Sequence, residues 1–370
     1  MDRHLDLDGG GSATRLRILV VGDSFCPADA FRPPFERLAG AHEVTFVDVI
    51  DQPGWRPTSA SELRLKEYQG SPAQVIEALD GHDVLVVQGA AVTDAVLDAD
   101  PALRMICCAR GGPVNIDVRA ATERSIPVVT TPGKNAVAVA ELAIAFIVML
   151  ARRLPEILRY VEAGGEFGHD NYEGRNWFGR DLAGHTLGLV GFGQIGRQVA
   201  SRARALEMEI LVFDPYVDPA VIAERGCAAV DLDGLLERSD YISLHARATA
   251  ENRGLIGATE VARMKPGACL VNTSRDVLID EAAVADGLAS GHLAGAAFDV
   301  VSPSPATGRH PLLAFPNVII ATHIGGATHD TLHHGGEMAV AEIERLLAGT
   351  PLVNVANPAA QPSPRAGSRA

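Results

Sequence analysis

Short apolar runs alternate with longer amphipathic stretches from Arg15 onward. The runs of the first half are rich in β-branched residues and apolar at consecutive positions, which is typical of strands buried on both faces of a parallel sheet. They are 17–23 (RILVVGD), 43–50 (EVTFVDVI), 83–89 (DVLVVQG), 105–111 (MICCARG) and 127–133 (PVVTTPG). Because helical segments separate them, we expect parallel strands joined by right-handed crossovers.

A second series of apolar runs has the same character and begins later in the chain. Its members are 186–193 (TLGLVGFG), 209–216 (EILVFDPY), 241–246 (YISLHA), 268–274 (ACLVNTS), 293–300 (LAGAAFDV) and 317–325 (NVIIATHIG). Together the two series predict an α/β fold with two doubly wound parallel sheets.

Two helical segments define how the domains connect. Residues 135–153 contain no Gly or Pro, which predicts a long buried helix that bridges the two domains. Residues 337–349 have helical spacing and a Gly stop, so we expect a helix that returns to the first domain. The predicted boundaries are therefore 15–133 plus 327–355 for a discontinuous domain and 134–326 for the domain inserted into it.

Composition narrows the class of protein. A chain of 370 residues is too long for one ordinary core, and its net charge of −14 argues against sequence-independent binding to nucleic acid or an anionic membrane. No apolar stretch is long enough to span a bilayer, and the five cysteines form no C-x-x-C pair, which predicts buried, reduced thiols in a cytoplasmic protein. Residues 1–14 and 357–370 are rich in Gly, Pro, Ser and Ala, so we predict that they are disordered.

A G-x-G-x-x-G motif follows the first strand of the second series and opens a helix. Its glycines permit a tight turn and close backbone approach, and the helix N-terminus offers N–H groups to a pyrophosphate. Asp214 ends the next strand, where its carboxylate can accept hydrogen bonds from ribose hydroxyls, which favours NAD over NADP. The predicted NAD-binding residues of this region are Gly191, Gly193, Gln194, Ile195, Gly196 and Asp214.

Polar residues follow the later strands at His245, Thr273, Asp299 and His323. With them the chain carries GGPVNID, NAVAVAELA, GRDLAGHTLGLVGFGQIG, LVNTSR, LAGAAFDV and HIGGAT. In their order and spacing these segments resemble the D-2-hydroxyacid dehydrogenases, the family that includes phosphoglycerate dehydrogenase, from about residue 15 to about residue 350. The fold class that we expect is a Rossmann NAD-binding domain inserted into a flavodoxin-like substrate domain.

The resemblance implies roles for individual residues. Arg275 would bind the carboxylate and carbonyl oxygen of the substrate, a two-pronged task that suits a planar guanidinium. His323 would donate a proton when a 2-keto acid is reduced and accept one when a hydroxy acid is oxidised. Asp299 and the backbone around Thr273 would hold the nicotinamide amide. Further implied cofactor contacts are His245, Ser274, Arg275, His323, Gly325 and Gly326, and amides near Gly89, Ala90 and Gly112 would receive the substrate carboxylate.

Three positions depart from the family pattern. Ser304 stands where the family places a glutamate beside its histidine, and serine can hydrogen-bond an imidazole but cannot stabilise its charged form by charge. Asp276 replaces the glycine that usually follows the catalytic arginine, and Arg247 stands where proline is common. Arg247 has two interpretations, as a site for an anionic substrate or phosphate, or as a solvated loop charge. Arg275 has a structural alternative, an ion pair with Asp276 or Asp280.

These patterns leave two hypotheses of different classes. The first is an NAD-dependent oxidoreductase that acts on a small 2-hydroxy or 2-keto acid, with Arg275 and His323 as catalytic residues. The second is an NAD(H)-sensing binding protein of the same fold with little catalysis, which Ser304 favours. The resemblance also implies a homodimer with its interface between Asn135 and about Phe178. We expect no metal site, and we expect surface positions for the histidines without a family setting, which are His310, His329, His333 and His334.

Overall fold

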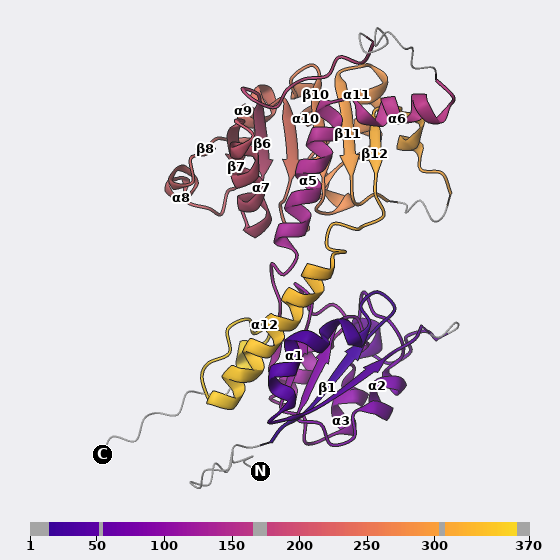
Figure 1. Ribbon diagram of the computed structural model, residues 1–370, viewed down its shortest axis with the longest axis vertical. Helices are drawn as coiled ribbons and strands as arrows, with labels where there is room; N and C mark the ends of the chain where they lie inside the picture. The colour runs from indigo at the N-terminus through magenta and orange to yellow at the C-terminus, as the bar shows by residue number, and fades with distance from the viewer. Residues whose placement is uncertain (1–14, 52–54, 166–175, 303–307, 361–370) are drawn as a thin grey trace. The chain divides into compact units, whose positions relative to one another are not determined.

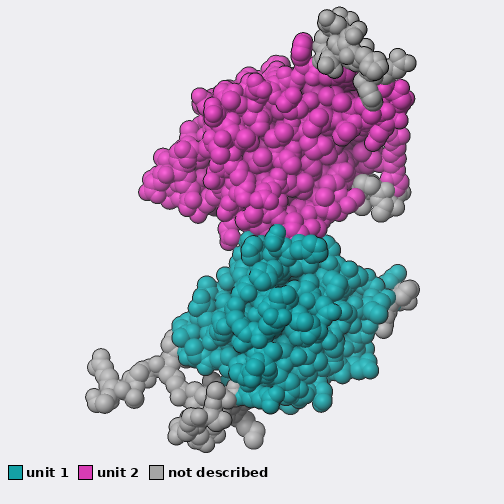
Figure 2. Space-filling view, in the orientation of Figure 1, with its two compact units in different colours: residues 1–134, 329–370 teal, residues 135–328 magenta. Residues whose placement is uncertain are grey.

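The computed structural model describes residues 15–51, 55–165, 176–302 and 308–360 of the chain. These residues divide into two compact units, which Figure 2 colours separately. Unit 1 holds residues up to Lys134 and from His329 onward, and unit 2 runs from Asn135 to Thr328. No helix of the described residues is both long and apolar enough to cross a membrane.

Unit 1 is built on a five-stranded parallel sheet in the order β2-β1-β3-β4-β5. This is the flavodoxin-like order, with its switch point between β1 and β3. The strands are β1 (Arg17–Gly22), β2 (Glu43–Asp48), β3 (Val84–Val87), β4 (Met105–Cys108) and β5 (Val128–Thr130). The helices are α1 (Arg32–Ala39), α2 (Pro72–Ala78), α3 (Asp94–Ala99), α4 (Val118–Glu123) and α12 (His329–Ala348), with 3-10 turns η1 (Ala28–Phe31), η2 (Glu62–Arg64) and η7 (Pro358–Ala360).

Helices cover both faces of this sheet (Figure 1). Apolar residues of α2, α3 and α4 pack on one face, and those of η1, α1 and α12 pack on the other. The returning C-terminal helix that the sequence predicts is α12, but it begins at His329, eight residues before the predicted start at Glu337. The predicted strands of this half all form. Four of them, β1, β3, β4 and β5, are apolar runs that the two helical layers bury, whereas β2 is only partly buried.

The prediction of disorder from residue 357 onward is wrong for residues 357–360. Pro358–Ala360 form the turn η7, and the side chain of Asn357 is buried. The Asn357 amide oxygen accepts a hydrogen bond from the backbone N–H of Val128 at 2.7 Å, and its Nδ2 donates to the carbonyl of Ile126 at 2.9 Å. These hydrogen bonds, with that from Ala356 N–H to the carbonyl of Val128, hold the segment beside β5 in spite of its Pro- and Ala-rich composition.

Unit 2 is built on a seven-stranded parallel sheet in the order β12-β11-β10-β9-β6-β7-β8. Counted from the first strand of the unit, this is the Rossmann order 3-2-1-4-5-6 with one further strand. The strands are β6 (Thr186–Val190), β7 (Glu209–Phe213), β8 (Ala228–Ala229), β9 (Tyr241–Leu244), β10 (Ala268–Asn272), β11 (Leu293–Phe298) and β12 (Val318–Ile320). The helices are α5 (Ala136–Ala151), α6 (Leu154–Glu162), α7 (Gln194–Ala205), α8 (Pro219–Glu224), α9 (Leu232–Arg238), α10 (Ala258–Arg263) and α11 (Glu281–Ala289), with 3-10 turns η4 (Asp276–Leu278) and η6 (Pro311–Ala314).

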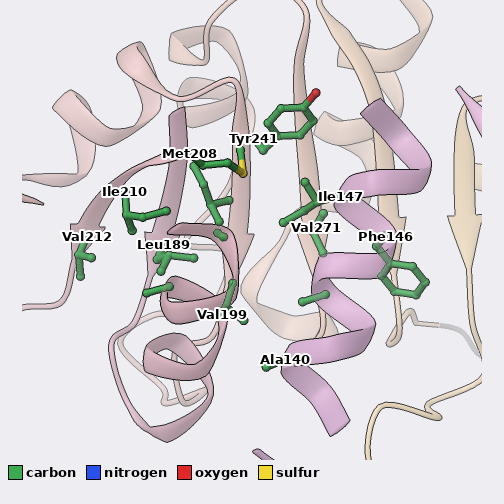
Figure 3. Packing of buried hydrophobic residues seen from close by; sticks show 14 of the residues in the cluster. Ala140, Phe146, Ile147, Leu189, Val199, Met208, Ile210, Val212, Tyr241 and Val271 are labelled. Carbon is green, nitrogen blue, oxygen red and sulfur yellow. The ribbon is translucent and has the colours of Figure 1, made fainter. Parts of the chain in front are cut away.

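The helices of unit 2 again form two layers. One layer contains α5, α7 and α8, and Figure 3 shows its core, in which Ile147 of α5 and Val199 of α7 pack with Leu189 of β6. The other layer contains α9, α10 and α11. Complete burial of a side chain such as Ile147 stabilises the unit by roughly 1.5–3 kcal/mol. All five cysteines are free and buried in these cores, as the sequence predicts.

Candidate active site

The order of the strands in unit 2 reverses between β6 and β9, where a doubly wound sheet opens a crevice for ligands. Val190 pairs with Leu244 at the carboxyl ends of these strands, so Gly191 and His245 emerge side by side. A Cβ on Gly191 would lie 2.6 Å from the backbone nitrogen of Ala246, and the residue has a φ of +100°. This position therefore requires glycine, both for the conformation and for the close approach.

The other two glycines of the motif serve different purposes. A Cβ on Gly196 would lie 2.3 Å from the carbonyl oxygen of Gly191, so Gly196 lets α7 approach the turn. A Cβ on Gly193 would meet nothing within 4 Å, and Gly193 caps α7 without a side-chain hydrogen bond. The free space at Gly193 and the N-terminus of the 12-residue helix α7 thus form a cradle of the kind that holds a pyrophosphate.

Asp214 follows β7 and braces the glycine turn. Its Oδ2 accepts a hydrogen bond from the backbone N–H of Phe192 at 2.7 Å, and its Oδ1 accepts from the N–H of Tyr216 at 2.9 Å. A carboxylate oxygen has two lone pairs, so each oxygen retains capacity for a further donor such as a ribose hydroxyl. The sequence did not reveal this second, structural use of Asp214.

A pocket of about 390 Å³ lies beside the glycine turn in unit 2. It brings together most of the site residues that the sequence predicts in the later strands, which are His245, Thr273, Ser274, Arg275, Asp299, His323, Gly325 and Gly326, together with Ile195. It also includes Arg247, for which a site for an anionic substrate or phosphate is one of two interpretations, and four residues for which the sequence predicts no role, Asn135, Val139, Ala246 and Ala248. Asn135 and Val139 belong to the NAVAVAELA segment, which is one of the segments that resemble the family. Their place at the site could therefore have been predicted from the resemblance.

His323 occupies an unusual turn that Asp299 holds. His323 has a φ of +60°, in the left-handed region that a non-glycine residue rarely adopts. Its backbone N–H donates to the carbonyl of Asp299 at 2.9 Å, while Ile324 N–H and Gly325 N–H donate to Asp299 Oδ1 and Oδ2 at 2.7 and 2.8 Å. Asp299 is 2% exposed, so these hydrogen bonds are shielded from water. The carboxylate therefore fixes the backbone that carries the exposed His323 side chain.

Arg275 presents an exposed guanidinium at the same pocket. Its Nη1 donates to the carbonyl of Ser274 at 2.7 Å, and the side chain forms no ion pair with any residue that the structure describes. Asp280 instead caps α11, where its Oδ1 accepts from the N–H groups of Ala282 and Ala283. The alternative in which Arg275 serves only as an ion-pair partner therefore has no support in this geometry.

Two buried polar atoms of the pocket residues lack a hydrogen-bond partner among the described residues, Nδ1 of His245 and Oγ1 of Thr273. Burial lowers the pKa of His245 to about 4, so its ring is neutral near pH 7. The other ring nitrogen, Nε2, lies 2.9 Å from the hydroxyl of Ser243. Buried polar atoms normally have partners, and two unpartnered atoms beside an open glycine cradle fit a polar cofactor.

The remaining predicted residues lie elsewhere. Gly89, Ala90 and Gly112 belong to unit 1, where the Gly89 carbonyl accepts from Gln69 N–H at 2.8 Å and the Ala90 carbonyl accepts from Asn115 Nδ2 at 2.8 Å. Ser304 lies outside the described residues, so its predicted place beside His323 stays a prediction.

The surface positions predicted for the other histidines hold for three of them. His329, His333 and His334 are exposed on α12. The prediction is wrong for His310, which is buried with its Nε2 at 3.0 Å from a carboxylate oxygen of Glu281. The partner that makes burial of His310 possible lies 29 residues away in the sequence. The described residues contain no cluster of His, Cys, Asp and Glu that could hold a metal ion.

Comparison with known proteins places this site in a family. A model of the NAD binding domain of D-isomer specific 2-hydroxyacid dehydrogenases matches residues 144–325. The D-3-phosphoglycerate dehydrogenase of Archaeoglobus fulgidus is 36% identical over 295 residues, 79% of this chain and 55% of that protein. The chain thus spans about half the length of the phosphoglycerate dehydrogenases that it matches. The glyoxylate reductase of Korarchaeum cryptofilum is 38% identical over 290 residues, which cover 78% of this chain and 86% of that enzyme.

Solved structures agree with this placement. A protein from Thermus thermophilus matches with a TM-score of 0.71 and 31% identity, covering 92% of this chain and 99% of that one. A glyoxylate reductase from Paecilomyes thermophila matches with a TM-score of 0.69 and 27% identity, over 93% and 99% of the two chains. The family match confirms NAD as the cofactor that the glycine motif predicts. The chain belongs to the D-isomer specific 2-hydroxyacid dehydrogenase family.

Proposed function

We propose that the protein is an NAD-dependent oxidoreductase that transfers a hydride between NAD(H) and a small 2-hydroxy or 2-keto acid. The observation that carries this proposal is that the unpaired guanidinium of Arg275 and the exposed imidazole of His323 line one pocket. An arginine can bind a carboxylate with two parallel hydrogen bonds, and an imidazole can exchange a proton near neutral pH. The relatives named as phosphoglycerate dehydrogenase and glyoxylate reductase support the same chemical class.

Each residue has a distinct role in this proposal. NAD supplies the hydride acceptor or, as NADH, the hydride donor. Arg275 binds the carboxylate and the C2 oxygen of the substrate, which fixes the carbon that reacts. His323 gives a proton to the C2 oxygen during reduction and removes it during oxidation, and the turn that Asp299 holds sets the direction of its ring.

The cofactor contacts follow from the same geometry. The N–H groups at the start of α7 face the cradle at Gly193 and bind the pyrophosphate, while the Asp214 carboxylate accepts from the adenosine ribose. The free hydroxyl of Thr273 and the remaining lone pairs of Asp299 hold the nicotinamide amide. In unit 1, amides near Gly89, Ala90 and Gly112 remain the proposed contacts for the substrate carboxylate.

The test is NADH oxidation by the full chain against a panel of 2-keto acids, with variants at Arg275. Arg275→Ala should lower turnover by roughly 100-fold or more, the effect of two charge-assisted hydrogen bonds, while the Kd for NADH changes little. Arg275→Lys should rescue little, because one ammonium cannot replace a two-pronged contact. Arg253→Ala is the matched control, since Arg253 is exposed in the same unit and does not line the pocket. Near-normal turnover of Arg275→Ala would contradict the assignment.

The same panel tests the alternative function. A chain that binds NADH tightly but oxidises it with no 2-keto acid would be an NAD(H)-sensing binding protein. The catalytic proposal predicts turnover with at least one member of the panel, because a sensor needs no proton donor such as His323 beside the nicotinamide.

We also propose a homodimer. Exposed apolar residues recur on α6 at Leu154, Leu158 and Val161, a helical spacing that forms one stripe, and the side chain of Phe178 is 79% exposed. All four lie in the segment from Asn135 to Phe178 that the resemblance implies as the interface. Sedimentation velocity should find a dimer that Leu158→Glu dissociates, while Leu63→Glu, at an exposed leucine of unit 1, leaves it intact. A wild-type monomer at micromolar concentration would refute the proposal.

A further inference from the structure

Arg247 is a cation without a counter-charge at the cofactor pocket. It lies three residues after β9 and lines the 390 Å³ pocket together with Ile195 of α7. Its side chain is exposed and forms no ion pair or hydrogen bond with the residues that the structure describes. An exposed arginine is commonly a solvated charge. Whether the Arg247 guanidinium can contact a bound ligand depends on where its backbone is held.

The backbone of Arg247 is fixed on both sides. Before it, the nitrogen of Ala246 lies against the glycine turn, where a Cβ on Gly191 would approach it to 2.6 Å. After it, Asn252 Nδ2 donates to the carbonyl of Arg247 at 2.8 Å, and Thr249 N–H donates to Asn252 Oδ1 at 2.7 Å. The guanidinium therefore extends from a braced segment whose backbone lies against the glycine turn.

The cradle lacks another free cation among the described residues of its turn and helix start. Arg197 is the basic residue in the first turn of α7, but its Nε donates to the carbonyl of Phe192 at 3.0 Å, and its guanidinium lies 5.7 Å from the centre of the Phe192 ring. The backbone amides and the helix dipole supply only partial charge. A pyrophosphate carries two negative charges, and the chain that binds it has a net charge of −14. A cation close to the pyrophosphate would offset this repulsion.

We propose that Arg247 binds the pyrophosphate of the dinucleotide as a side-chain partner of the glycine turn. Its guanidinium donates charge-assisted hydrogen bonds to phosphate oxygens that the α7 N-terminus holds from the other side. This role is specific to the arginine of this chain, since the commonly found proline has neither a charge nor a donor at this position. It concerns NAD binding alone and does not depend on the identity of the keto acid.

Fluorescence titration with NADH tests the contact without turnover. Arg247→Ala should raise the Kd about 5- to 50-fold, the range of a charge-assisted hydrogen bond at a partly solvated site. Arg253→Ala, at an exposed arginine of the same loop outside the pocket, should leave the Kd unchanged. Calorimetry should find the same loss for ADP-ribose, which retains the pyrophosphate, and no loss for adenosine. The Kd of the variant should also rise less steeply with salt.

Several outcomes would overturn the proposal. An unchanged Kd for NADH would show that Arg247 is a solvated loop charge. Equal losses for adenosine and ADP-ribose would place the guanidinium on the base, and a loss confined to NADPH would place it on the 2′-phosphate. An unchanged Kd with a raised KM for the keto acid would assign Arg247 to the substrate. Because the Kd values need no catalysis, they stand whether or not the proposed hydride transfer is correct.

Discussion

The turn that carries His323 depends on the carboxylate of Asp299, and Asp299→Asn tests this dependence. In the native turn both carboxylate oxygens accept backbone N–H groups, from Ile324 at 2.7 Å and from Gly325 at 2.8 Å. An asparagine keeps one acceptor oxygen and replaces the other with an NH₂ group, which is a donor. One of the two N–H groups would then face a donor in a site that is 2% exposed.

The expected loss follows from these contacts. A hydrogen bond to a charged group contributes about 1.5–3 kcal/mol, and the stranded buried N–H adds a penalty of about 1–3 kcal/mol. The left-handed conformation of His323, with its φ of +60°, opposes the turn by roughly 1 kcal/mol before any mutation. We therefore expect Asp299→Asn to destabilise the turn by about 3 kcal/mol, an approximately 100-fold change in its closing equilibrium.

Hydrogen exchange and kinetics together measure this effect. The amides of Ile324 and Gly325 should exchange roughly 100-fold faster in the variant, and kcat should fall at least tenfold because the imidazole is no longer aimed. Asp280→Asn is the control, since the Asp280 carboxylate also accepts two backbone N–H groups but caps α11 away from the pocket. Native exchange and native kcat in Asp299→Asn would refute the positioning role. Native exchange with a weakened Kd for NADH would show that Asp299 acts on the nicotinamide instead.

Three further predictions concern the cofactor site. Gly193→Ala should leave the melting temperature nearly unchanged, because the added Cβ meets nothing within 4 Å. The same methyl group should weaken NADH binding, because it fills the cradle. An unchanged affinity for NADH would show that the pyrophosphate binds elsewhere. NADH should bind much more tightly than NADPH, because the Asp214 carboxylate accepts from the ribose and repels a 2′-phosphate. Asp214→Ala should narrow this difference in affinity, and equal affinities of the wild-type protein for NADH and NADPH would contradict the assignment of Asp214 to the ribose. The pKa of His245, lowered to about 4, means that the unfolded chain takes up a proton between pH 7 and 5 that the folded chain does not. Stability should fall by about 2 kcal/mol over that range, and less in His245→Gln, as denaturant titrations can measure.

The sequence predicts the sheets well because most of their strands are buried on both faces. A continuous apolar run such as Ile18–Val21 needs no partner to be recognised, and nearly every strand of the structure coincides with such a run. The strand β8 is the exception, because Ala228–Ala229 is two residues long and exposed, so it has no pattern to detect. The early start of α12 was missed for another reason: Gly335 and Gly336 weaken the helical pattern, yet both are buried, and a Cβ on Gly336 would lie 2.7 Å from the ring of Pro34.

At the site, too, features that depend on a short segment could be predicted from the sequence, and features that depend on long-range contacts could not. The glycine motif and the strand ends could be found because each function depends on a short, ordered segment. The burial of His310 depends on Glu281, and the order at Asn357 depends on Val128, 229 residues away. The second use of Asp299 was also hidden, since a sequence does not show which backbone N–H groups a carboxylate meets. Tertiary hydrogen bonds of this kind determine whether a single polar residue is buried or ordered, and the periodicity of the sequence does not show them.

The buried cysteines allow chemical labelling to show which of the two units has unfolded. Cys26, Cys107 and Cys108 belong to unit 1, and Cys227 and Cys269 belong to unit 2. Burial raises the pKa of Cys26, Cys108 and Cys269 to about 12, so the reactive thiolate is scarce in the folded state. An alkylating reagent applied during partial denaturation would therefore label three thiols when unit 1 opens and two when unit 2 opens, and mass spectrometry would tell the two events apart.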